Sequence, residues 1–209
     1  MPAHHVPDEA LLAYAAGTAT AGEELLVACH LTVCPTCRRS VEEAERGGEV
    51  ALGRAEAVPV GDDALAAVLA RLDGPAPAPL KVAECPVFPM PLRRRIGPLA
   101  ALPWRAVGFD VRAAKVDLDG DQRVFLLDFP PTFRIPVHGH HGVERALVLR
   151  GGFTDEAAHF DRGDVSWHDE AGHDVRIDPD GRCTTLFVND GATDYGWLSG
   201  LVDWWVVRR

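Results

Sequence analysis

The pattern of apolar and polar positions divides the chain into two parts, one with the spacing of helices and one with the short apolar runs of strands. Residues 1–74 place apolar side chains at helical spacing. Gly17 ends the first helix, and Pro35 separates the second from the third, because proline suits the first turn of a helix and not its interior. A core this small would be stabilised by a bound metal. The expected helices span about 7–16, 23–31, 36–46 and 64–72.

After residue 84 the texture changes to short runs rich in β-branched and aromatic residues, separated by Gly, Pro and Asp. Short strands between such turns predict an all-β barrel or sandwich. The Trp204–Trp205 pair in the last run could close the barrel or form an interface, so a homodimer stays open. The expected strands fall within 107–118, 123–129, 145–149, 174–177, 183–188 and 201–209.

A segment of alternating proline and alanine, Gly74–Pro79, stands between the two textures. This composition favours an extended polyproline spacer. We therefore expect a multidomain α plus β protein, with a small helical bundle over residues 1–74, a linker over 75–84 and a β-barrel domain over 85–209.

Charge and hydropathy argue against two classes of partner, nucleic acids and membranes. The net charge of −10 argues against direct nucleic-acid binding, because DNA affinity rests largely on Lys and Arg. The basic run 93–95 is too short to change this and is interpreted as a solvated turn. No apolar stretch approaches the ~20 residues that a membrane span needs. Asp8 and Glu9 stand where a secretory signal carries basic residues, so we expect a cytoplasmic protein.

The first candidate site is a H-x3-C-x2-C cluster formed by His30, Cys34 and Cys37. One imidazole and two thiols at this spacing can converge on one zinc ion, and a tetrahedral site needs a fourth ligand. His4 and His5 are the available donors, and chemistry alone does not choose between them. A redox C-x-x-C is less favoured because no βαβ pattern precedes it. The other cysteines, Cys29, Cys85 and Cys183, are expected to be small buried side chains.

The second candidate site lies about a hundred residues further on. His138 and His140 are two residues apart, so on a strand they point to the same side and can bind one metal. Glu144 follows a turn at Gly142 and can add a carboxylate. Imidazole and carboxylate donors suit zinc, iron, manganese or nickel.

These motifs carry a family resemblance. Residues 5–17 and 29–38 resemble a zinc-binding anti-sigma domain, and with the second half the chain resembles the ChrR-type anti-sigma factors. The resemblance implies that His5 completes the zinc set with His30, Cys34 and Cys37. It also implies a cytoplasmic helical module that binds an extracytoplasmic-function (group IV) sigma factor.

The second half resembles a cupin, a double-stranded β-helix barrel, through its H-x-H-x3-E-x6-G pattern. This resemblance implies a later histidine as fourth ligand. His173 is preferred because it precedes a strand-like run, and His168 is the competing candidate, expected to be exposed in a turn. His141 and His159 are not expected to be ligands. Thr132 stands where the cupin pattern has glycine, which puts catalysis in doubt more than metal binding.

The resemblance implies a regulator and not an enzyme. The helical domain would sequester the sigma factor, and the metal-binding cupin would release it on an oxidative signal, with singlet oxygen as the family's signal class. The alternative is a cupin dioxygenase or isomerase that carries a zinc module.

Overall fold

The computed structural model describes residues 1–72, 74, 84–168, 173–191 and 193–194, apart from the side chains of residues 136, 140, 193 and 194. Most of the expected linker and the last expected strand, with Trp204 and Trp205, lie outside the described residues. No helix in the described part of the chain is long and apolar enough to cross a membrane.

The four expected amino-terminal helices are present. Thr20 and Glu23 form a capping box that starts the second helix, and Pro35 occupies the first turn of the third, as its missing N–H allows. The third helix runs on to Leu52, past the expected end. The helices are α1 (Asp8–Ala15), α2 (Ala21–Leu31), α3 (Pro35–Leu52) and α4 (Ala64–Leu72).

A further helix, α5 (Met90–Ile96), was not expected, and the short 3-10 turn η1 (Leu99–Ala101) follows it. The prolines around residue 90 are typical of a loop in the sequence, but proline is tolerated in the first turn of a helix. Residues 93–95 form the last turn of α5, so the expectation of a non-helical turn was wrong, whereas Arg94 and Arg95 are exposed to solvent as expected. Leu92 anchors this helix and is fully buried.

The strands form two antiparallel sheets. The six-stranded sheet has the order β1-β2-β3-β10-β5-β8, and the five-stranded sheet has the order β11-β4-β9-β6-β7. Their bounds are β1 (Arg105–Gly108), β2 (Val111–Lys115), β3 (Arg123–Phe129), β4 (Arg134–His140), β5 (Glu144–Arg150), β6 (Phe153–Thr154), β7 (His159–Phe160), β8 (Val165–His168), β9 (His173–Ile177), β10 (Cys183–Asn189) and β11 (Thr193–Asp194).

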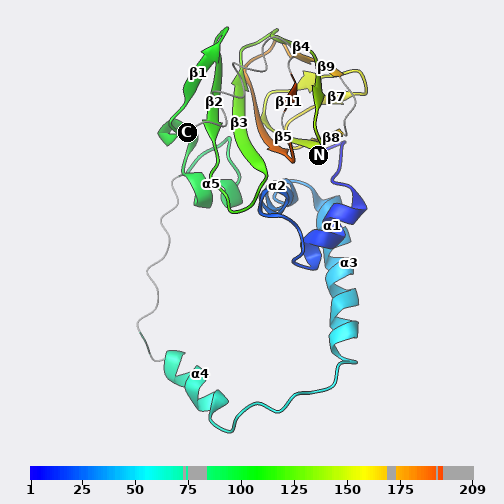
Figure 1. Cartoon of the computed structure of the whole chain (residues 1–209), viewed down its shortest axis with the longest axis vertical. Coiled ribbons are helices and arrows are strands. Elements are labelled where there is room, and N and C mark those ends of the chain that lie inside the picture. Colours follow the sequence, from blue (N-terminus) through cyan, green and yellow to red (C-terminus); the bar gives the residue numbers. More distant parts are fainter. Residues whose placement is uncertain (73, 75–83, 169–172, 192, 195–209) are drawn as a thin grey trace.

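One apolar core lies between the two sheets. It combines Phe125 and Phe187 of the six-stranded sheet, whose rings stack, with Phe153 and Val175 of the five-stranded sheet. Each sheet therefore buries one face against the other, which gives the cupin-like barrel seen at the top of Figure 1.

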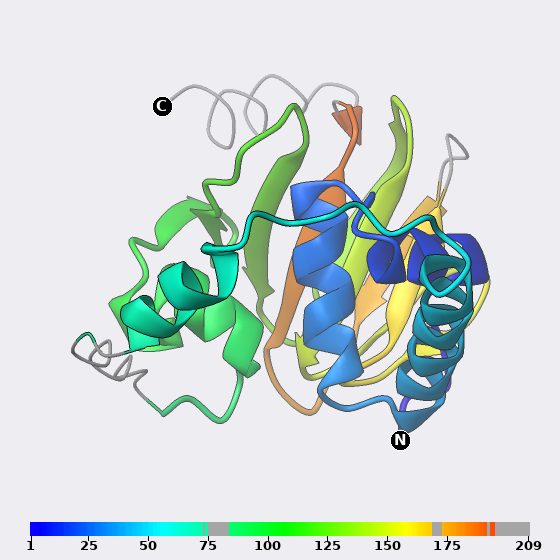
Figure 2. The ribbon, with the colours of Figure 1, turned by 90° about the horizontal axis from the view of Figure 1, so that it is seen from below.

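A second core joins the helices to the outer face of the six-stranded sheet. Leu26 of α2 and Leu92 of α5 pack in one buried cluster with Leu186 and Val188 of β10, and Figure 2 shows α2 lying across the strands. A Cβ on Gly22 would come within 2.7 Å of Val188 Cγ1, so glycine permits this approach. The helical part thus shares its core with the barrel, whereas α4 lies apart from both (Figure 1).

Candidate metal centres

The first candidate centre gathers its donors where α2 ends and α3 begins. His30 lies in the last turn of α2 and is fully buried, Cys34 is the N-cap of α3, and Cys37 lies in the first turn of α3. The extended segment before α1 brings His5 to them. His5 Nδ1 lies 3.3 Å from Cys34 Sγ and 3.6 Å from Cys37 Sγ, and His30 Nε2 lies 3.3 Å from Cys37 Sγ.

These spacings fit a tetrahedral ion. With Zn–N bonds of about 2.0 Å and Zn–S bonds of about 2.3 Å, neighbouring donors on a tetrahedron lie about 3.5 Å apart. The four donor atoms all lie within 4.8 Å of one another. His4 points elsewhere, since its Nε2 donates to the His159 carbonyl at 3.0 Å and its ring packs on Phe160. The structure thus brings His5, and not His4, into this cluster.

Burial shifts the pKa of two of these donors, His30 and Cys37. Burial lowers the pKa of His30, although its hydrogen bond to the Gly163 carbonyl opposes this. Burial raises the pKa of Cys37 to about 11. The site therefore holds a neutral imidazole and a protonated thiol, and a cation that binds here must displace the thiol proton.

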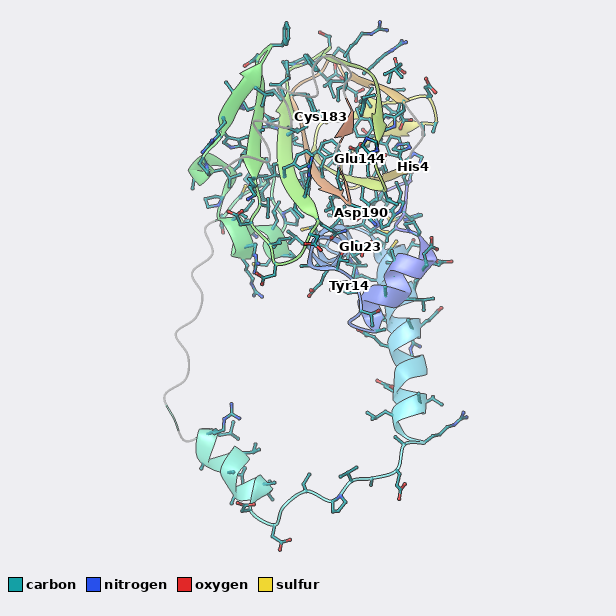
Figure 3. All side chains as sticks on the ribbon, in the orientation of Figure 1. His4, Tyr14, Glu23, Glu144, Cys183 and Asp190 are labelled. Carbon is teal, nitrogen blue, oxygen red and sulfur yellow. The ribbon has the colours of Figure 1, made fainter. Side chains whose placement is uncertain are left out.

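The second candidate centre lies inside the barrel. His138 of β4 pairs directly with His173 of β9, and their rings are 4.5 Å apart. Glu144, at the start of β5, places Oε1 3.8 Å from His173 Nε2. All three side chains are buried, and Figure 3 shows Glu144 within the barrel. The His140 backbone ends β4, but its side chain lies outside the described residues, so its role as a ligand stays a prediction.

The carboxyl group of Glu144 has an unusual environment. Burial raises its pKa to about 7, although the Asn189 side-chain amide, which donates to Oε2 at 3.0 Å, opposes this. A carboxylate removed from water in this way needs a cation or a proton. A divalent metal held by two imidazoles and this carboxylate would supply the charge.

His168 differs from the expectation that it lies exposed in a turn. It ends β8 opposite Glu144, and its ring lies 4.3 Å from that of His173. Its Nε2 donates to Asp155 at 3.0 Å. Burial raises the pKa of Asp155, but this bond and two backbone amides outweigh it, so the pKa is lowered overall. No strand was expected over β8, so nothing in the sequence placed His168 beside Asp155.

The described residues around the second centre leave little space. The cavity has a volume of about 20 Å³ and is lined, beyond the polar groups, by Phe, Leu, Ile and Val side chains. This is room for about one water or one ion. An organic substrate would need a much larger pocket.

Comparisons with known proteins place the chain in a family, although no family model matches it. The anti-sigma-E factor ChrR of Cereibacter sphaeroides is 38% identical over 170 residues, which are 80% of this chain and 79% of that protein. The chain belongs to the ChrR family of anti-sigma factors. The resemblance carried by the two histidine motifs is thereby confirmed.

A solved structure of ChrR agrees with this assignment. ChrR in the crystal structure of Rhodobacter sphaeroides SigE in complex with the anti-sigma ChrR matches with a TM-score of 0.81 and 34% identity, covering 91% of this chain and 100% of that one. A cupin-like protein of unknown function from Ralstonia eutropha matches over 50% of this chain and 81% of its own, at 19% identity and a TM-score of 0.41.

Proposed function

We propose that this protein is an anti-sigma factor that sequesters an extracytoplasmic-function sigma factor in the cytoplasm through its amino-terminal helices. The observation that carries the proposal is the likeness, over nearly the whole chain, to a ChrR chain crystallised with SigE. The net charge of −10 supports it, because an acidic surface complements a partner that must itself bind DNA.

The exposed side of α4 is the surface that we assign to the sigma factor. Leu65, Val68, Leu69 and Leu72 are 69%, 55%, 50% and 73% exposed, and no residue of α4 is buried against the described chain. The spacing i, i+3, i+4, i+7 puts all four on one side of the helix. An amphipathic helix without a partner of its own is suited to an apolar groove on another protein.

A structural zinc ion would hold together α1, α2 and α3, the helices that precede α4 in the chain. His5, His30, Cys34 and Cys37 would be its ligands, and four protein ligands leave no open coordination position. The ion would tie the amino-terminal segment to the junction of α2 and α3. Zinc removal should therefore loosen α1 and α3 and weaken sigma-factor binding.

The barrel would act as the sensor. His138, His140, Glu144 and His173 would bind zinc or another divalent metal such as iron, manganese or nickel, and an oxidative signal at this centre would release the sigma factor. The buried carboxyl group of Glu144 supports a bound cation. A cupin enzyme is not favoured, because a cavity of about 20 Å³ does not accommodate an organic substrate.

The experiment is a capture from lysate of the native host with the full chain as bait, followed by identification of bound proteins. We expect one sigma factor, lost when zinc is removed and lost with Cys34→Ser. Cys85→Ser is the matched control, because it removes a half-buried thiol outside the cluster. Zinc-loaded bait that captures no sigma factor would refute the proposal.

A further inference from the structure

We propose that Asp164 of the barrel is a positioning residue for the amino-terminal metal site, so that the site's zinc affinity depends on the barrel. This role rests on the zinc site proposed above. A turn more than a hundred residues further along the chain would hold two of the proposed zinc ligands in place. That turn, Asp161–Asp164, connects β7 to β8 and is here named the anchor turn.

The anchor turn holds a proposed ligand directly. His30 Nδ1 donates to the Gly163 carbonyl at 2.8 Å, in a fully buried position. This bond places the ring proton on Nδ1 and leaves Nε2 free to bind a metal. A backbone carbonyl that orients a metal-binding imidazole in this way is a common outer-shell partner of zinc sites.

The Asp164 carboxylate fixes the other side of the same site. Its Oδ1 accepts from the backbone amides of Ala3 at 2.6 Å and His4 at 3.0 Å, directly before the proposed ligand His5. Its Oδ2 accepts from the Asp161 amide at 2.8 Å and so closes the anchor turn. One carboxylate, 2% exposed, therefore positions both the segment that carries His5 and the carbonyl that holds His30.

Packing leaves the anchor turn little freedom. Gly163 has a φ of +96°, which side-chain-bearing residues rarely adopt. A Cβ there would also lie 3.1 Å from Pro2 Cγ and from Val33 Cγ2. The amino-terminal segment and the connection between α2 and α3 thus pack closely against the turn, and a displaced turn would displace them.

The anchor turn also lies close in sequence to the second centre. Strand β8 begins at Val165, directly after Asp164, and ends at His168, whose ring packs on His173. One short strand therefore separates the anchor turn from the barrel's proposed ligands. A rearrangement around His168 would shift β8 and the anchor turn that precedes it. Because the anchor turn contacts the segment that carries His5 and accepts a hydrogen bond from His30, a change at the second centre would then reach the proposed zinc site.

The test compares Asp164→Ala with Asp161→Ala in the full chain. The Asp161 side chain is exposed, while its amide stays in place in the variant, so it is a matched control. Zinc affinity is measured by competition with a chromogenic chelator. Outer-shell changes cost about 10–100-fold in metal affinity, so we expect Asp164→Ala to lose at least about tenfold and Asp161→Ala less than about twofold.

A second readout separates positioning from general loss of stability. With Co²⁺ in place of zinc, the visible absorption of a tetrahedral site reports ligand geometry, and Asp164→Ala should shift it while Asp161→Ala should not. If Asp164→Ala does not fold, Asp164→Asn, which keeps the size and one acceptor, should shift affinity and spectrum in the same direction. If Asp164→Ala folds and keeps the wild-type zinc affinity and Co²⁺ spectrum, the role of Asp164 is refuted while the proposed zinc site stands. If Asp164→Ala does not fold, the same result in a folded Asp164→Asn would refute that role. A wild-type chain that binds no zinc would overturn the proposed zinc site as well.

Discussion

Replacing Arg145 by methionine removes the cation that joins α2 to the barrel. Arg145 follows Glu144 on β5 and is 6% exposed. Its guanidinium lies 2.8 Å from the Glu23 carboxylate of α2, donates to Asp190 at 2.8 and 3.0 Å, and lies over the ring of Trp167. Figure 3 shows Glu23 and Asp190 where the helices meet the barrel.

The size of the effect follows from these contacts. Removing one partner of a buried ion pair costs about 3–5 kcal/mol, because the other charge stays buried. The Glu23 and Asp190 side chains remain 18% and 36% exposed, so water compensates in part. Methionine keeps the apolar stem over Trp167. We therefore expect a loss of about 2–3 kcal/mol in the free energy of unfolding at pH 7.

The assay is urea unfolding of the full chain, followed by tryptophan fluorescence and by circular dichroism. The control is Arg176→Met, because the Arg176 side chain is 60% exposed and its ion pair with Asp174 spans 3.7 Å. This variant should stay within about 0.5 kcal/mol of wild type. If Arg145→Met also stays within that range, the ion pair does not stabilise the contact between α2 and the barrel.

Three further variants test other parts of the structure. Leu69→Asp should weaken sigma-factor binding by about 4–12-fold or more in a titration, since half of a buried leucine side chain is worth about 0.8–1.5 kcal/mol. Ala67→Asp, on the opposite side of α4, should not weaken it, and equal effects would contradict the assigned surface. Burial raises the pKa of Asp128, but hydrogen bonds from Arg112, Thr184 and Arg182 outweigh it and lower the pKa. Its stabilisation is thus present above the unfolded value of about 4 and lost as pH falls through the folded value; Asp128→Asn should flatten this acid limb in unfolding measured from pH 2 to 6, and an unchanged limb would argue against it. Gly22→Leu should cost about 1–3 kcal/mol on thermal or urea unfolding, because a Cβ already meets β10; wild-type stability would show that α2 does not pack this closely.

Local sequence signals predicted much of the fold because they depend on neighbouring residues. The helical spacing, the proline at the start of α3 and the turn-bounded strands β3, β5 and β10 are of this kind. The expected strand over residues 107–118 was wrong as one element, since Phe109 and Asp110 turn back with φ of 51° and 60° and split it into β1 and β2. Gly108, directly before this turn, has a φ of 119° and is a local signal that the expectation of one continuous strand did not use.

In the candidate sites, too, the residues that are close in sequence were predictable and the distant contacts were not. The motifs bring His30 together with Cys34 and Cys37, and His138 together with Glu144, as their spacing indicated. The supports of these sites were not predictable, because the Asp164 carboxylate meets an amide 161 residues earlier in the chain. No local period encodes such a tertiary contact, and the shared core between helices and barrel is of the same kind.

The most direct test of the account is run-off transcription with RNA polymerase and the captured sigma factor, to which the zinc-loaded full chain is added. The account predicts that transcription falls to background at about one chain per sigma factor and is restored when His30→Ala replaces the wild-type chain. Unchanged transcription in the presence of excess, folded, zinc-loaded chain would contradict the claim that this protein is an anti-sigma factor.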